Sequence, residues 1–145
     1  MQATHTLFVY GTLKHGGKWH HLLANSKLIT PDSVKGEMYL HKDLYPVLFT
    51  GEDDISGETY LVPEGDYDKA VALESDALYN VALIETASGH KAEVFFSTDE
   101  STRDPAHRIA HFDAEFYFKK WLEMASPSSE SYQSFLEWGG RPEIR

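Results

Sequence analysis

The 145-residue chain contains no cysteine. This absence excludes disulfide bonds, zinc or iron–sulfur sites built from cysteine, and catalysis by a thiol nucleophile. A chain without thiols is compatible with any redox compartment, so cysteine usage does not indicate where the protein resides.

Long apolar runs and positive charge are also scarce. No apolar run approaches the roughly 20 residues that a membrane-spanning helix needs. The residues from Met1 to His5 lack the basic segment and apolar core of a secretory signal. With 13 lysines and arginines against 23 acidic residues, the net charge is −10, which is poorly suited to neutralising the phosphates of nucleic acid. We therefore expect a soluble cytoplasmic protein that binds neither nucleic acid nor a membrane.

Composition and patterning favour a single α+β domain over residues 1–145. Hydrophobic residues make up 41% of the chain and aromatic residues 13%, which is enough for a packed core. Strand-like runs dominate the first two-thirds of the chain: 7–10, 34–40, 45–49, 55–62, 80–86 and 91–97. Helix-like patterns dominate the rest, so we expect a strand-rich core in residues 1–100 and a helical C-terminal extension in residues 104–145.

Capping residues and apolar periodicity predict three helices. Asp66 is a candidate N-cap for a helix that ends near Ser75. Asp104 followed by Pro105 predicts the start of a long helix, and residues 129–138 predict a short final one. The long helix carries an apolar stripe, which indicates packing against the sheet: Ala110, Ala114, Tyr117, Trp121 and Met124.

The segment from Leu7 to Leu13 is the strongest candidate for a binding element. A buried strand opens there directly onto Gly11 and Thr12, so successive backbone N–H groups have little side-chain cover. Such groups can bind a carboxylate or a developing oxyanion. Single-glycine turns are common, however, and spacing alone favours an ordinary strand–turn connection.

The residues from Phe8 to Gly16 resemble the Tyr-Gly-[Ser/Thr]-Leu strand–loop signature of the γ-glutamylcyclotransferase-like, or AIG2-like, family. The resemblance continues in order through further short segments: 34–39, 45–46, 56–60 and 73–79. It is closest to the γ-glutamylamine cyclotransferase branch, in which the loop after the catalytic glutamate also runs into Ala-Leu-Tyr. The resemblance implies a small mixed β-barrel with flanking helices.

The resemblance also implies a reaction and a set of site residues. The free α-amine of a γ-glutamyl group attacks its own side-chain carbonyl, expels an amine and leaves 5-oxoproline. One carboxylate can move both protons, so no cofactor, metal or covalent nucleophile is required. By this resemblance Glu74 is the general acid/base, and Tyr79 is an aromatic wall of the pocket. The substrate-binding loop is then formed by Tyr10, Gly11, Thr12 and Leu13.

Three departures from the family pattern leave a second interpretation open. The stretch from Ala70 to Ala72, with Val71 at its centre, replaces a usual acidic residue; Asn80 follows the tyrosine where arginine is usual; and Trp19 stands where asparagine is common. A catalytically weak member that binds a small anionic ligand or a protein partner is therefore an alternative.

Two further features of the sequence concern a candidate metal site and the charge of the leaving group. His107 and His111 lie four residues apart on the predicted long helix, but they lack a third convincing ligand, so a metal-dependent hydrolase is the less favoured reading. The net charge of −10 mildly favours a cationic leaving group, such as a lysine side chain or a polyamine, through long-range attraction.

Overall fold

The computed structural model describes residues 4–42, 45–75 and 79–140, which build one mixed sheet and three α-helices. The sheet has the strand order β4-β5-β1-β3-β2-β6, and all of its neighbours are antiparallel except β1 and β5. Its strands are β1 (Thr4–Val9), β2 (Lys27–His41), β3 (Tyr45–Pro63), β4 (Tyr79–Glu85), β5 (Lys91–Ser97) and β6 (Arg108–Ile109). The α+β class is confirmed. The sheet curls without closing, because β4 and β6 remain its two edges.

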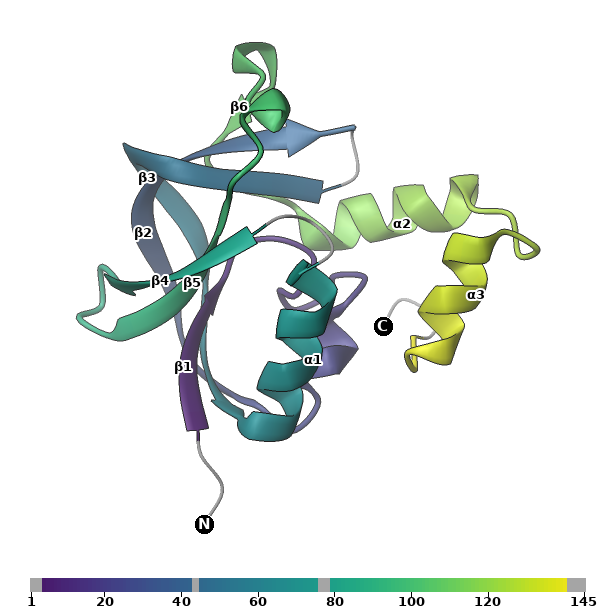
Figure 1. The fold of residues 1–145 in the computed structure, drawn as a ribbon, viewed down its shortest axis with the longest axis horizontal. Coiled ribbons are helices and arrows are strands. Elements are labelled where there is room, and N and C mark those ends of the chain that lie inside the picture. Colours follow the sequence, from purple (N-terminus) through teal and green to yellow (C-terminus); the bar gives the residue numbers. More distant parts are fainter. Residues whose placement is uncertain (1–3, 43–44, 76–78, 141–145) are drawn as a thin grey trace.

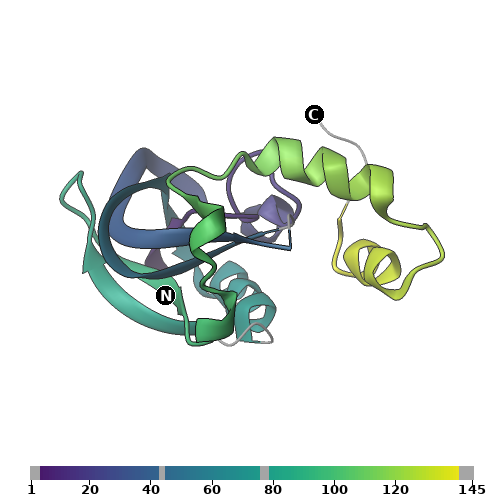
Figure 2. The ribbon, with the colours of Figure 1, turned by 90° about the horizontal axis from the view of Figure 1, so that it is seen from above.

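All three helices lie to the same side of the strands in Figure 1. Helix α1 (Glu64–Ser75) packs across the sheet, whereas α2 (Ala114–Met124) and α3 (Glu130–Glu137) extend from it to one side (Figures 1 and 2). Short 3₁₀ helices complete the chain: η1 (His20–Leu23), η2 (Glu100–Thr102) and η3 (Pro105–His107). Within the described ranges, none of the helices has the length and apolar character needed to cross a membrane.

The second half of strand β1 is buried on both of its faces. Leu7 and Val9 pack into the cluster that includes η1 and α1, while Phe8 and Tyr10 pack into the cluster that includes the start of α2. Side chains alternate between the two faces of a strand, so a strand covered on both sides has to be apolar throughout. This explains the uninterrupted apolar run in the sequence, and it places the end of β1 in the centre of the molecule.

The long hairpin of β2 and β3 forms the largest part of the sheet. The two strands expected at 45–49 and 55–62 are one continuous strand, β3, which pairs with β2. The pairing of the two strands shifts register between Gly36 and Glu37 of β2. Gly57 lies where β3 passes β1, and a side chain there would place its Cβ 2.3 Å from the carbonyl oxygen of Val9. The close approach of the two strands therefore requires glycine at this position.

The predicted helix from Asp104 to Met124 is wrong in its first half. The Asp104 carboxylate accepts a hydrogen bond from the Ala106 N–H at 3.0 Å, but this turn ends with η3. The chain then extends as β6 and pairs with β2. Helix α2 begins only at Ala114, where the Asp113 carboxylate accepts from the Phe116 N–H at 3.1 Å. Pairing with the sheet edge thus outweighs the local helix signal.

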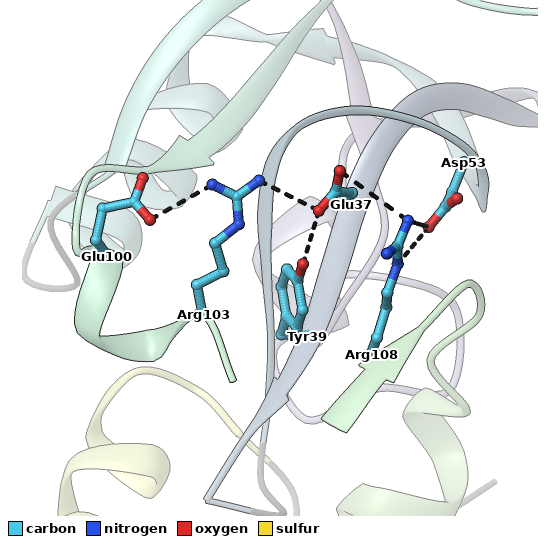
Figure 3. A network of polar contacts seen from close by, with 6 residues as sticks. All are labelled: Glu37, Tyr39, Asp53, Glu100, Arg103 and Arg108. Carbon is cyan, nitrogen blue, oxygen red and sulfur yellow. Dashed lines mark hydrogen bonds and ion pairs between the residues drawn. The ribbon is translucent and has the colours of Figure 1, made fainter. Parts of the chain in front are cut away.

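Two arginines fix this connecting segment to the sheet (Figure 3). Arg103 approaches a Glu37 carboxylate oxygen at 3.2 Å, and Arg108 approaches the other at 4.0 Å. Tyr39 donates to Glu37 at 2.7 Å, and Arg108 also pairs with Asp53 at 2.8 Å. Since this segment leads directly into α2, the network sets where α2 leaves the sheet.

A buried carboxylate anchors the other helix, α1. The helix begins at Glu64, so Asp66 lies in its first turn and does not serve as the predicted N-cap. Asp66 is 1% exposed and accepts hydrogen bonds from the Asn25 N–H at 2.8 Å, the Asn25 amide at 3.3 Å and the Ser26 hydroxyl at 2.9 Å. These bonds fix the start of α1 against the segment after η1.

Replacement of Asp66 by alanine should destabilise the fold. The change removes the charged acceptor of the hydrogen bonds from Asn25 and Ser26, and we expect the free energy of unfolding to fall by about 3 kcal/mol. Urea denaturation, monitored by circular dichroism, measures this change in the free energy of unfolding. Asp68→Ala, an exposed substitution two residues further along α1, is the matched control and should change stability by less than about 0.5 kcal/mol. Equal effects of the two substitutions would contradict the anchoring role.

Candidate active site

A cavity of about 460 Å³ lies where β1 ends, between the end of α1, the start of β3 and the C-terminal helices. This volume is within the range of small-molecule binding sites. Its walls are mainly aromatic and aliphatic, with contributions from Phe8, Leu13, Leu73, Phe95, Phe112 and Tyr117.

The loop that follows β1 presents its backbone to this cavity. A Cβ at Gly11 would lie 2.8 Å from the Pro46 side chain, so glycine permits the close contact between the loop and the start of β3. The Gly11 carbonyl accepts from the Lys14 N–H at 3.0 Å, and the Thr12 carbonyl accepts from the Trp19 N–H at 3.0 Å. The loop is thereby closed on itself.

Two side chains hold the same loop from outside. Glu58 on β3 accepts hydrogen bonds from the His15 N–H at 2.8 Å and from the Tyr60 hydroxyl at 2.9 Å. The buried ammonium of Lys14 donates to the Phe112 carbonyl at 2.9 Å. Burial lowers the pKa of Lys14, which nearby acids partly oppose.

The loop retains donors that the fold does not use. Among the residues that the structure describes, no acceptor is found for the backbone N–H groups of Gly11, Thr12 and Leu13. All three residues line the cavity. Unpaired N–H groups carry partial positive charge, so this part of the wall can bind a carboxylate or an oxyanion.

Glu74 brings a carboxyl group into the same cavity from the C-terminal end of α1. The residue is partly exposed because it faces the cavity. Desolvation by the surrounding protein raises the pKa of Glu74 to about 8. No ion-pair partner is found for it in the described part of the chain, so nothing there offsets the desolvation. A carboxyl group in this state can take up and release protons near neutral pH.

Two tyrosines lie beside this carboxyl group. The Tyr10 hydroxyl donates to the Phe95 carbonyl at 2.6 Å, and the Tyr79 hydroxyl donates to the Pro46 carbonyl at 3.2 Å. Burial raises the pKa of both phenols, and the Glu74 charge adds to the effect in each. Both therefore remain neutral hydrogen-bonding groups at physiological pH.

The structure brings every predicted site residue to one cavity: Tyr10, Gly11, Thr12, Leu13, Glu74 and Tyr79. Two of the three departures from the family pattern lie elsewhere. Val71 packs into the core beneath α1, and Asn80 is exposed on β4. Trp19, the third departure, does line the cavity. The segment from 76 to 78, between Glu74 and Tyr79, lies outside the described residues.

The C-terminal helices contribute a part of the cavity that the sequence analysis assigned to core packing. Phe118, Trp121 and Phe135 form an aromatic cluster with Trp19, and the first two also line the cavity. Lys18 lies among these rings and was missed altogether, because its surroundings come from distant parts of the chain. The only sequence signal was the neighbouring Trp19.

The predicted histidine pair does not share a helix. His107 ends η3 and lies 3.6 Å from Asp104, whereas His111 belongs to the extended segment before α2. A search of the described residues finds no group of three or more histidine, aspartate or glutamate side chains that could hold a metal ion. The two histidines therefore do not lie one turn apart on a helix, as their four-residue spacing had predicted.

Comparison with known sequences identifies the family. The family model "Gamma-glutamyl cyclotransferase, AIG2-like" matches residues 7–121. A Vibrio cholerae protein named "Putative gamma-glutamylcyclotransferase" is 40% identical over 88 residues, which span 59% of this chain and 76% of that protein. The similarly named YkqA of Bacillus subtilis is 37% identical over 92 residues, which span 54% of this chain and only 33% of that protein.

Solved structures show the same fold at lower sequence identity. An uncharacterized protein from Pyrococcus horikoshii superposes with a TM-score of 0.62 at 22% identity, covering 82% of this chain and 94% of the other. A mouse AIG2-like protein superposes with a TM-score of 0.60 at 17% identity, covering 72% of this chain and 82% of the other. These structures show the shared fold, and the match of the family model to residues 7–121 establishes that the chain belongs to the γ-glutamyl cyclotransferase, AIG2-like family.

Proposed function

We propose that this protein is a γ-glutamyl cyclotransferase that converts a γ-glutamyl amine or γ-glutamyl amino acid into 5-oxoproline and a free amine. One observation carries the proposal: the desolvated carboxyl group of Glu74 shares a small cavity with the unpaired backbone N–H groups of the loop after β1. The first is suited to moving protons near neutral pH, and the second to binding an anion.

In the first step, ionised Glu74 accepts a proton from the α-ammonium group of the substrate. The freed amine attacks the γ-carbonyl carbon of the same glutamyl group and closes a five-membered ring. The carbonyl oxygen becomes an oxyanion, which the N–H groups of Gly11, Thr12 and Leu13 are placed to stabilise. Because nucleophile and electrophile belong to one molecule, proximity requires no covalent enzyme intermediate.

In the second step, the protonated Glu74 donates its proton to the nitrogen of the leaving amine. The old carbon–nitrogen bond breaks and the carbonyl re-forms. Glu74, ionised again, then takes the extra proton from the ring nitrogen and passes it to the departing amine, so that 5-oxoproline and an ammonium ion are released. Glu74 returns to its ionised form, and no water is consumed. A carboxyl group with a pKa near 8 suits both directions of proton transfer.

Tyr10 and Tyr79 form the part of the cavity wall that lies beside Glu74. Their hydroxyl groups donate to main-chain carbonyls of β5 and β3, so both rings are held at the wall of the cavity that Glu74 shares. Their apolar surfaces maintain the desolvation that raises the pKa of Glu74. We assign them to positioning and to the pocket wall.

Replacement of Glu74 by glutamine should abolish most of the activity. The amide has nearly the same shape but cannot accept the ammonium proton, so we expect kcat/KM to fall about 100-fold or more. The measurement is 5-oxoproline release from a panel of γ-glutamyl amines and γ-glutamyl dipeptides. Glu85→Gln, an exposed substitution on β4, should leave the rate unchanged. If the wild-type protein releases no 5-oxoproline from any compound of the panel, the cavity is a binding site and the cyclotransferase proposal fails.

The same substitution should change the pH dependence of stability. Desolvation raises the pKa of Glu74 from 4.5 to about 8 in the folded state, so the folded protein holds this proton more tightly than the unfolded chain does. The stability contributed by the protonated carboxyl is fully present below about pH 4.5 and is lost as the pH rises toward 8. Glu74→Gln should therefore leave the free energy of unfolding nearly unchanged at pH 4.5 and raise it by on the order of 2–4 kcal/mol at pH 8 and above. Urea denaturation between pH 4.5 and 9 measures this; a difference independent of pH would rule out a desolvated carboxyl group.

A further inference from the structure

The cavity has a second charged group, which the proposed chemistry does not use. Among its described lining residues, Lys18 and Glu74 are the only charged side chains. Glu74 projects from α1, whereas Lys18 lies against α2 and α3, which stand apart from α1 (Figures 1 and 2). The pKa of each is shifted by desolvation alone, without a contribution from the other's charge. The cavity therefore has an acidic end and a separate basic end.

Aromatic rings hold the Lys18 ammonium group in place. Its Nζ lies 3.7 Å from the ring centroid of Trp121, 5.2 Å from that of Trp19 and 5.9 Å from that of Phe135. At such distances the ring faces attract a cation. They position the group without neutralising its charge.

The ammonium group has no anionic partner within the described part of the chain. No carboxylate forms an ion pair with Lys18, although the chain carries an excess of ten negative charges. Desolvation lowers its pKa to about 8, which leaves it predominantly protonated at neutral pH. An ammonium group offers three N–H donors, and a desolvated cation without a counter-ion favours the binding of an anion.

We infer that Lys18 binds a carboxylate on the leaving group, so that the preferred substrates are γ-glutamyl conjugates of amino acids rather than of simple amines or polyamines. The inference rests on the proposed function, which places the γ-glutamyl group at the Glu74 end and directs the leaving group toward the helices. Ser131 of α3 lines the same end of the cavity and offers a hydroxyl group there.

The net charge of the chain points the other way, toward a cationic leaving group. Exposed charges are screened over about 8–10 Å at physiological salt, so they act weakly on a group inside the cavity. The Lys18 ammonium acts at contact distance and in a desolvated setting, where its interaction is much stronger. The local charge should therefore decide which leaving group is preferred.

The test uses substrate pairs that differ only by a carboxylate. γ-Glutamylalanine is compared with γ-glutamylethylamide, and the γ-glutamyl conjugate of 4-aminobutyrate is compared with γ-glutamylpropylamide, which extends the reach of the carboxylate. In the wild-type protein we expect kcat/KM for 5-oxoproline release to favour the carboxylate member of at least one pair about 10- to 100-fold. Lys18→Gln should lose this preference, so that kcat/KM for the carboxylate member of the pair falls to about that of the neutral member.

Two further variants separate charge from structure. Lys18→Arg keeps a cation that can stack on the same rings, so it should retain the preference. Lys91→Gln removes one positive charge from an exposed position on β5, away from the cavity, and should also retain it. Thermal unfolding midpoints within a few degrees of the wild-type value establish that each variant is folded.

The outcomes distinguish this inference from the proposed function. Equal turnover of both members of each pair, or a preference that survives Lys18→Gln, overturns the role of Lys18 and leaves the cyclotransferase intact. If no compound is turned over, the proposed function fails, and calorimetric binding of the same pairs decides the inference. Tighter binding of the carboxylate member to the wild type than to Lys18→Gln then supports an anion site, and equal or absent binding refutes it.

Discussion

Burial of the second half of β1 on both faces is the constraint on which the rest of the structure depends. Leu7 and Val9 fill one core cluster, and Phe8 and Tyr10 fill the other. The buried end of the strand leads into a loop that is itself largely buried, at Tyr10, Gly11 and Leu13, so the backbone of this loop emerges inside the molecule. Its N–H groups are then left without strand partners beside an apolar cavity, which is the condition under which they can bind an anion.

The second requirement is that the C-terminal helices lie over this loop. Helix α2 reaches it because the connecting segment is fixed to the sheet by β6 and by the arginine pairs with Glu37. The aromatic cluster around Trp121 and Phe135 then joins α2 to α3 and to Trp19. Desolvation inside the cavity thus depends on ion pairs that lie outside it and on ring contacts that form part of its wall.

The sequence predicted those parts of the molecule whose conformation is set by nearby residues. The apolar run in β1, the break at Gly11 and the strand-like runs that follow are local patterns, and they sufficed for the strand–loop element and for the α+β class. The family resemblance added Glu74 and Tyr79, and the structure brings both to the cavity beside Tyr10.

The sequence was insufficient where distant segments compete with local signals. Asp104 and Pro105 carry a genuine helix-start signal, but the next residues pair with the edge of β2 and remain extended. Lys18 resembles any lysine in a polar loop until Trp121 and Phe135 are placed around it. Neither outcome can be read from a window of neighbouring residues, because each depends on contacts across most of the chain.

The division of the cavity between two sets of segments has a consequence for how the proposed activity could diversify. The groups proposed to carry the chemistry come from β1, its loop and α1, whereas the wall around Lys18 is completed by α2 and α3. Substitutions in the two C-terminal helices could therefore reshape selectivity for the departing amine while the proton-transfer apparatus stayed intact. An architecture of this kind allows new substrates to be acquired by changing the end of the chain alone.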